Sequence, residues 1–334
     1  MIALEADRRA EITDRFLSVP GVELHPAEGL AEIYRLLLGV ADYIEISEAV
    51  LEKLGGTVNP ARTLLRLPYA EYMDRWPGFH LYVCPFFKLK RYERILVEMV
   101  FPANSWNDVL LLRGKGAQIR ISGMGDLLLG DWRHGFDILL DIGKVELSPG
   151  NRHGCAAAIA FEWLKAGGTR VAASFLGQGG FAPLEELLMA IRLGGAAVPA
   201  AAFRCLALLK LAYCRATGRR IPSHKPILGD EIFLVESGVH VDGIGKNPAN
   251  YEPFPPELVG LRRRLGVGKH SGGRAIAMKL EQYGIQADSR AAANLLASVR
   301  RESVRLGRGL SDAEFLGLAK KSRKWGWPAG DPDC

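Results

Sequence analysis

Apolar residues change along the first two thirds of the chain between helical and strand-like spacing. Residues 27–39 have apolar side chains at helical spacing, and residues 42–47 follow at once with a strand pattern. Strand-like segments recur at 79–84, 94–100, 109–112, 118–122, 144–147 and 169–175, and residues 22–25 are a candidate first strand. Because strands that alternate with helices form parallel sheets, the pattern predicts an α/β fold whose mostly parallel sheet is open or closed into a barrel.

The middle of the chain contains a glycine-rich segment between a predicted strand and a predicted helix. Helices are expected at 154–167, 183–193 and 200–218, and the segment 176–181 reads LGQGGF. Such a loop can bind an anion, because its amides are free and the helix dipole favours negative charge. Gly177 and Gly179 are therefore candidate cofactor-binding residues. A tight turn without a ligand explains the same glycines equally well.

The predicted elements divide the chain into two domains. Strands are poorly marked between Glu48 and Phe79, which indicates that a barrel here would be modified or incomplete. A proline at position 222 ends the scaffold, so we expect a barrel-like domain at 1–222 and a lid segment with a helical subdomain at 223–334. The helices expected there are 275–283, 291–306 and 311–321, and the last begins with the capping-box residues Ser311 and Glu314.

Length and charge narrow the possible partners. A chain of 334 residues can bury a large α/β core and still carry an appended subdomain. Its net charge of +6 comes from scattered Lys and Arg with short runs such as Arg262 to Arg264, which solvated helix faces explain. Attraction of an anion such as a coenzyme phosphate is the alternative. Since no aromatic residues interleave with the basic runs, we expect no nucleic-acid partner.

Cysteine usage and the amino-terminal sequence predict the cellular compartment. The five cysteines are widely spaced, and none pairs with a Cys or His at zinc-site spacing; they are Cys84, Cys155, Cys205, Cys214 and Cys334. Reduced thiols in a cytoplasmic protein are therefore expected. The amino-terminal residues are charged where a signal peptide needs an apolar core, and there is no run of about 18 apolar residues. We expect a soluble protein without a membrane partner.

An irregular stretch from Glu236 to Gly273 combines two histidines and a tyrosine with many Gly and Pro residues. Segments of this kind are usually functional loops or lids. The stretch contains, in order, the motifs ESGVHVDG, NPANYEPF and GKHSG. With these motifs, residues 221–320 resemble the region after the barrel in the homocitrate synthase and 2-isopropylmalate synthase family, most of all the nitrogenase-associated homocitrate synthases.

The resemblance implies a fold, an activity and two site residues. The implied fold is a (β/α)8 TIM-type barrel followed by a helical lid subdomain, which acts in a homodimer or in a heterodimer with a homologous condensing enzyme. The implied activity is an acyl transfer that condenses acetyl-CoA with a 2-oxo acid such as 2-oxoglutarate on a divalent metal. Motif match makes His240 and Tyr251 catalytic. A histidine suits the base that enolises a thioester, and a phenol can donate to the developing oxygen charge. Packing within the subdomain is the alternative role.

The barrel segment departs from the motifs that hold the metal in relatives. Relatives begin with Arg-Asp-Gly-Glu-Gln, and the nearest candidate here, residues 22–29, does not match it. Where relatives carry His-x-His-Asn-Asp, this chain has Ser148 and Gly150 in place of the histidines and keeps Asn151. The later loop that carries a metal-binding Asn in relatives has become residues 177–182 with a deletion. We therefore assign no metal ligands.

Three hypotheses about function follow. The chain is a homocitrate synthase-like condensing transferase with a rebuilt site, a non-catalytic partner that donates its lid to an active paralogue, or a small-molecule sensor. A rebuilt metal site would draw on His25, His153, Asp126 and Asp131, whose spacing gives no positive indication of a site. Family resemblance favours the first hypothesis, and the missing ligands favour the second.

Overall fold

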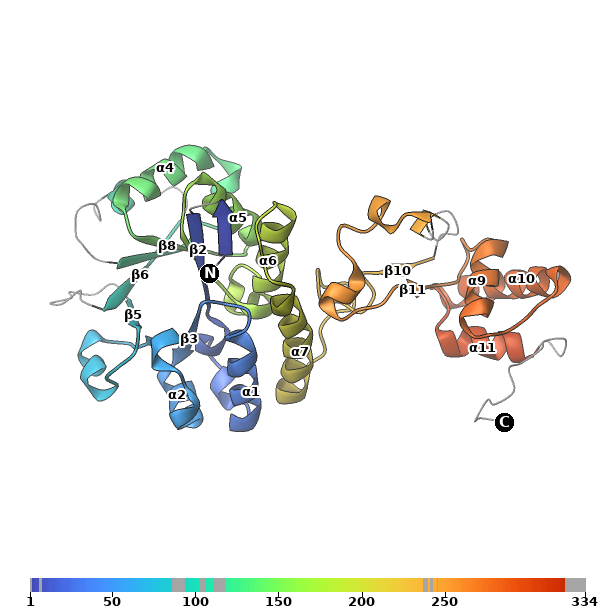
Figure 1. Ribbon diagram of the computed structural model, residues 1–334, viewed down its shortest axis with the longest axis horizontal. Helices are drawn as coiled ribbons and strands as arrows, with labels where there is room; N and C mark the ends of the chain where they lie inside the picture. Colours follow the sequence, from blue (N-terminus) through green and yellow to red (C-terminus); the bar gives the residue numbers. More distant parts are fainter. Residues whose placement is uncertain are drawn as a thin grey trace. The chain divides into compact units, whose positions relative to one another are not determined.

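The computed structural model describes residues 2–5, 8–85, 94–102, 106–110, 118–236, 240, 243–244 and 246–321. The chain divides into two compact units, Met1–Leu228 and Gly229–Cys334. Strands and helices alternate in the first unit, and the three longest helices of the second unit lie together at its carboxyl-terminal end (Figure 1).

Eight parallel strands among the described residues close into a barrel in the first unit. In order around the ring they are β2 (Arg8–Asp14), β3 (Tyr43–Ser47), β4 (Thr63–Arg66), β5 (Leu81–Pro85), β6 (Ile95–Phe101), β7 (Gln118–Gly123), β8 (Val145–Pro149) and β9 (Arg170–Ala173). The ring closes because β9 pairs in parallel with β2. A short strand, β1 (Ile2–Glu5), adds to β2 as an antiparallel neighbour. The predicted TIM-type barrel is confirmed.

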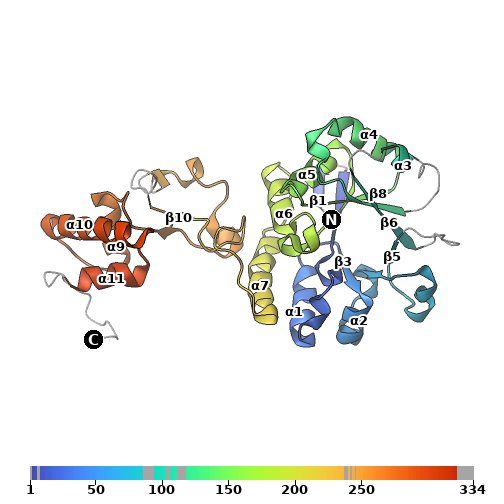
Figure 2. The same ribbon diagram turned by 180° about the vertical axis from the view of Figure 1, so that it is seen from behind.

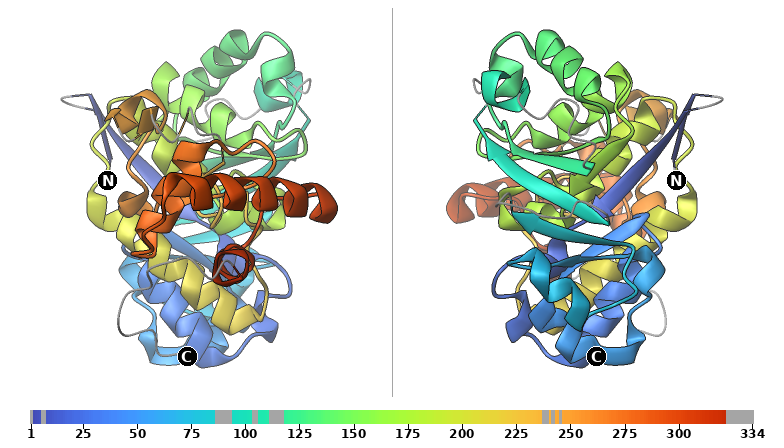
Figure 3. Two further views of the ribbon diagram at one scale, coloured as in Figure 1. Left: turned by 90° about the vertical axis from the view of Figure 1, so that its right-hand side faces the viewer. Right: turned by 90° about the vertical axis from the view of Figure 1, so that its left-hand side faces the viewer.

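Helices cover the outside of the strands (Figure 2). They are α1 (Ala27–Leu37), α2 (Glu48–Leu54), α3 (Trp106–Leu110), α4 (Trp132–Ile142), α5 (Ala156–Ala166), α6 (Leu184–Leu193) and α7 (Ala200–Thr217). Helix α1 packs closely on α7 at Gly29, where an added Cβ atom would lie only 2.7 Å from the Cβ atom of Ala216. The twisted strands inside this layer are visible in the right-hand view of Figure 3.

Three strand predictions were wrong. Residues 22–25 are not the first strand, since Val22–Leu24 form a 3-10 turn, η2, and the first barrel strand is β2. The segment predicted as a strand at 109–112 begins inside helix α3, and its last two residues lie outside the described residues. The barrel is complete rather than modified, because β4 supplies a strand in the poorly marked region. Short apolar runs do not distinguish helix from strand, which explains the second error.

The second unit contains a short parallel ladder and a helical core. Strands β10 (Leu234–Val235) and β11 (Arg264–Leu265) pair, and helices α9 (Gly273–Gln282), α10 (Ser289–Leu306) and α11 (Asp312–Lys320) form the helical core. Buried apolar side chains join these helices, among them Val267, Ile276, Leu280, Leu295, Val299 and Phe315. The capping box of Ser311 and Glu314 at the start of α11 is confirmed.

Two further expectations concern thiols and membranes. Cys84, Cys155, Cys205 and Cys214 are free thiols, and Cys334 lies outside the described residues. None of the helices that the structure describes is long and apolar enough to cross a membrane.

Candidate functional site

The carboxyl ends of the barrel strands surround a cavity of about 410 Å³. TIM barrels place their active sites at this end of the sheet, so the cavity is the first candidate site. Its polar lining comes from β2, β4, β6, β7 and the turns that follow them, and Phe181 covers it from the loop after β9. The lining residues include Arg15, Ser18, Arg66, Glu98, Ser122 and Phe181.

A network of buried arginines and glutamates lies in and below this cavity. Arg66 donates to Glu45 at 2.7 Å and to Glu98 at 2.5 Å. Deeper in the barrel, Arg120 contacts both Glu45 and Glu146. Each of these charges has a partner of opposite sign, which is required because an unpaired buried charge costs several kcal/mol.

The network stays ionised at neutral pH. Burial alone would raise the pKa of Glu98, but the guanidinium groups of Arg15, Arg120 and Arg66 outweigh it and hold that pKa at about 2. Burial lowers the pKa of Arg15 to about 10, which leaves its side chain a cation at pH 7. The mouth of the barrel therefore carries fixed charges of both signs.

Arg15 lies at the centre of the mouth. Its Nη2 atom is 2.9 Å from Glu98 Oε1, and its Nη1 atom donates to Ser148 Oγ at 2.7 Å. The ring of Phe181 stacks on its guanidinium at 3.8 Å. One side chain thus contacts β6, β8 and the loop after β9.

Asp14 fixes the backbone from which Arg15 extends. Its carboxylate accepts the amides of Phe16 at 2.9 Å and Phe175 at 2.8 Å, so it joins the end of β2 to the end of β9. Burial raises the pKa of Asp14 to about 7, against the opposing effect of these two hydrogen bonds. Sequence analysis did not single out Asp14 and Arg15, and residues 22–29 were the wrong place to look for the end of the first strand.

The residues at the mouth do not fit the divalent metal that the resemblance implies. The Ser148 hydroxyl accepts from Arg15, and the Asn151 side chain accepts the amide of Ala156 at 3.2 Å. The backbone of Gly150 forms a bridge with Phe181. Among the described residues, no group of three or more His, Cys, Asp or Glu side chains could hold a metal ion. The structure therefore does not gather the alternative ligands His25, His153, Asp126 and Asp131 into a site.

The glycine-rich loop after β9 is partly occupied by its own hydrogen bonds. It forms the irregular turn η7 (Phe175–Gly180), in which Gly177 and Gly179 have φ angles of 67° and 74°. The amide of Gly177 donates to the carbonyl of Ser174 at 2.9 Å, whereas Gly179 lines the cavity. The cofactor-binding role of the two glycines stays a prediction.

His240 and Tyr251 lie side by side in the second unit. Their ring centroids are 5.6 Å apart, with the planes tilted by 57°. The Tyr251 ring passes over Gly243, where an added Cβ atom would lie 2.2 Å from the Tyr251 oxygen. Both side chains are exposed, Tyr251 by 45%. Parts of the surrounding ESGVHVDG motif lie outside the described residues, and the catalytic role of the pair stays a prediction.

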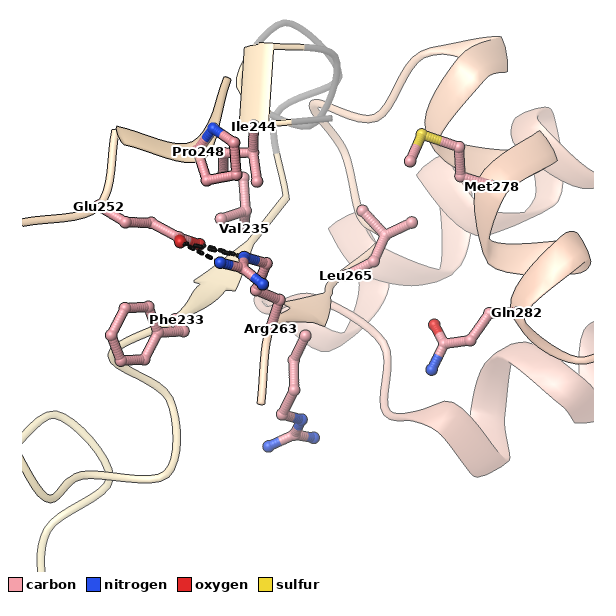
Figure 4. Close-up of a pocket in the computed structure, with 10 residues that line it drawn as sticks. Phe233, Val235, Ile244, Pro248, Glu252, Arg263, Leu265, Met278 and Gln282 are labelled. Carbon is pink, nitrogen blue, oxygen red and sulfur yellow. Dashed lines mark hydrogen bonds and ion pairs between the residues drawn. The ribbon is translucent and has the colours of Figure 1, made fainter. Parts of the chain in front are cut away.

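The second unit also contains a cavity of about 350 Å³, and several of its lining residues flank His240 and Tyr251 in the sequence (Figure 4). Its walls are largely apolar and include Phe233, Ile244, Pro248, Leu265 and Met278. On one side Arg263 and Glu252 form a two-pronged ion pair, with Nε–Oε1 and Nη2–Oε2 distances of 2.8 and 2.7 Å.

Glu236 joins two of the sequence motifs. Its Oε1 atom accepts the backbone amide of His270 at 3.2 Å, so ESGVHVDG and GKHSG are in direct contact. A Cβ atom at Gly268 would lie 2.5 Å from the same oxygen, so a larger residue there would displace the Glu236 carboxylate. The GKHSG turn is held further by the amide of Gly268, which donates to Ser271 Oγ at 2.9 Å.

The chain is similar in sequence to homocitrate synthases. Residues 227–305 match the family model described as homocitrate synthase post-HMGL domain-like. Homocitrate synthase 1 of Nostoc sp. is 40% identical over 183 residues, 54% of this chain and 48% of the relative. The homocitrate synthase omega subunit of Clostridium pasteurianum is 32% identical over 199 residues, 60% and 55% of the two chains. The chain spans about half the length of the curated relatives it matches.

A further curated relative and a solved structure complete the comparison. The 2-isopropylmalate synthase 2 of Caldanaerobacter subterraneus is 38% identical over 184 residues, which is 52% of this chain and 46% of the relative. An HMG-CoA lyase from Acinetobacter baumannii has 13% sequence identity and a TM-score of 0.49, over 64% of this chain and 98% of that chain.

Proposed function

Because the chain belongs to the homocitrate synthase and 2-isopropylmalate synthase family, we propose that it serves the condensation of acetyl-CoA with a 2-oxo acid. In this proposal it supplies His240 and Tyr251 to the barrel of a homologous, metal-binding subunit. The observation that carries the proposal is the contrast between the two units. The second unit presents an exposed His–Tyr pair, whereas the mouth of the barrel contains Arg15 where a metal would need ligands.

The condensation reaction needs a base and a hydrogen-bond donor, and the second unit contains an imidazole and a phenol side by side. Condensation begins when a base removes a proton from the methyl group of the acetyl thioester, and His240 would accept it as a neutral imidazole. Tyr251 would donate a hydrogen bond to the thioester oxygen, on which negative charge develops. The enolate carbon then attacks the keto carbon of the 2-oxo acid, and hydrolysis of the thioester releases coenzyme A. A divalent metal in the partner barrel would supply polarisation of the keto group.

A relative that is named as a subunit supports an assembly of more than one kind of chain. The Clostridium pasteurianum protein carries the name omega subunit of a homocitrate synthase. The exposure of His240 and Tyr251 is compatible with a site completed by another chain. The proposed partner is therefore a homologous condensing enzyme, with which the chain forms a heterodimer.

A complementation assay tests the proposal. A homologous condensing enzyme from the same genome is inactivated by replacing its own lid histidine with alanine and is then mixed with this chain. Thiol release from acetyl-CoA is followed with 2-oxoglutarate, 2-oxoisovalerate, pyruvate and oxaloacetate. We expect the wild-type chain to restore activity and His240→Ala not to restore it. His134→Ala, which changes an exposed histidine on α4, is the matched control and should restore it.

Two outcomes would contradict the proposal. One is a stable homodimer that neither binds nor activates any homologue, which would separate this chain from catalysis in a partner. The other is metal-dependent thiol release by the chain alone, which would make it a condensing transferase with its own rebuilt site.

A further inference from the structure

Three segments of the barrel meet at the guanidinium group of Arg15. They are the end of the first barrel strand, the end of β8 and the loop after β9, which are the places where the resemblance puts metal-binding motifs in relatives. The first supplies Arg15, the second offers Ser148 Oγ at 2.7 Å, and the third places the Phe181 ring 3.8 Å from the guanidinium.

The carboxylate at this point, Glu98, is already paired with two arginine side chains. Glu98 is the carboxylate among the described residues that line the cavity, and it contacts Arg15 at 2.9 Å and Arg66 at 2.5 Å. It also accepts from Ser122 Oγ at 2.5 Å. A divalent ion needs several oxygen or nitrogen ligands with free lone pairs at one point. In this mouth it would meet a guanidinium and a carboxylate that two guanidinium groups and a hydroxyl already contact.

The Arg15 side chain is firmly held in this position. Only 4% of it is exposed, and it contacts both the Glu98 carboxylate and the Phe181 ring. Its backbone follows Asp14, which is pinned by two amides. The backbone and the guanidinium of Arg15 are therefore both held in place.

We infer that the guanidinium of Arg15 takes the place of the divalent cation, so that the mouth of this barrel holds a built-in cation and excludes an exchangeable one. The inference concerns the chain's own barrel and does not rest on the proposed partner subunit. A failure of the complementation assay would leave it untouched, whereas tight metal binding by the wild-type barrel would also count against the proposed function.

Metal binding by the full-length chain tests the inference. The protein is stripped with EDTA and titrated with Mn²⁺, and bound metal is counted after equilibrium dialysis while the melting temperature is recorded. We expect no stoichiometric Mn²⁺ on the wild-type chain and none on Arg15→Lys, which keeps the charge. Arg15→Asp should bind one Mn²⁺ about tenfold or more tightly than wild type, because the mouth then loses the Arg15 guanidinium and gains a second carboxylate near Glu98, with Arg66 as the remaining cation.

Controls separate this effect from general acidification of the surface. Arg204→Asp, on the exposed face of α7 among alanine and leucine neighbours, should gain no Mn²⁺. If Arg15→Asp does not fold, Arg15→Gln removes the charge with a side chain of similar shape and should gain weaker binding. One tightly bound Mn²⁺ on the wild-type chain would overturn the inference. So would folded Arg15→Asp and Arg15→Gln proteins that bind no more Mn²⁺ than wild type.

Discussion

Arg15 Nη1 and Ser148 Oγ are joined by a hydrogen bond of 2.7 Å inside the barrel. Arg15 directly follows β2 and Ser148 lies in β8, and these strands are not neighbours in the ring because β9 lies between them. The bond therefore crosses the mouth and helps to set its shape. Its donor belongs to a network in which Arg15, Arg66 and Arg120 alternate with buried glutamates.

Removing one charge from the centre of that network should strongly destabilise the barrel. Arg120 is fully buried between Glu45 and Glu146, so Arg120→Met removes the guanidinium that Glu146 contacts and leaves Glu45 with Arg66 as its close cation. We expect the free energy of unfolding in urea to fall by about 3 to 5 kcal/mol. The double variant with Glu146→Gln should recover part of this loss. Arg215→Ala, which breaks an exposed ion pair with Glu32, should cost at most about 1 kcal/mol.

The stability of the protein should depend on pH through Asp14. Its pKa in the folded protein is about 7, raised by burial from 3.8. Between these values the folded state keeps a proton that the unfolded state has lost, so this group's contribution to stability is full below about pH 4 and disappears as the pH rises through 7.

Urea unfolding at several pH values from 5 to 8 checks this effect. The loss of stability with rising pH should be smaller in Asp14→Asn, although that variant is less stable overall because one amide loses its acceptor. Equal pH dependence in both proteins would show that Asp14 does not titrate in this range.

Gly243 should matter for the position of Tyr251. Gly243→Ala places a methyl group where the Tyr251 ring now lies, so the ring must move relative to His240. We expect the complementation rate to fall by about tenfold while the melting temperature stays the same, because misplaced reacting groups lose rate and Tyr251 is half exposed. Gly317→Ala, with open space around the new methyl group, is the control and should keep full activity. Unchanged activity in Gly243→Ala would mean that the pairing of the two rings is not needed.

Glu236 should protect the GKHSG turn. Glu236→Ala removes the acceptor of the His270 amide, and the lost hydrogen bond is worth about 1 to 2 kcal/mol of local stability. Amide hydrogen exchange at His270 should become about tenfold faster, whereas Glu281→Ala on the exposed side of α9 should leave it unchanged. Equal exchange in both variants would assign the turn's order to Ser271 and Ser303 instead.

The sequence predicts six of the eight barrel strands and four of the seven helices that the structure describes around them, and β2 and β4 are the strands that it misses. Helices such as α1 bury one face, so Leu30, Ile33 and Leu37 recur at helical spacing and the helix is visible in the pattern. Strand β2 was missed because its inward side chains include Thr13, which bonds to Glu146. A polar barrel interior removes the apolar alternation on which strand prediction depends.

The two candidate sites differ in how visible they are in the sequence. His240 and Tyr251 lie in compact motifs, and the structure brings their rings together. The role of Arg15 has no local signal, because it depends on contacts with Ser148 and Phe181 that only the closed barrel creates. A single arginine after a strand looks like any other exposed charge until its neighbours are known.

Closure of the ring has a consequence for how the protein is made. The hydrogen bond between Asp14 and the amide of Phe175 joins residues separated by 161 positions, so β2 cannot find its second neighbour until β9 has left the ribosome. During translation the growing sheet has two open edges, each able to pair with another nascent chain. A chain that stops within α5 would keep both edges for good. We therefore expect such a fragment to aggregate, whereas a fragment ending after α7 closes its barrel.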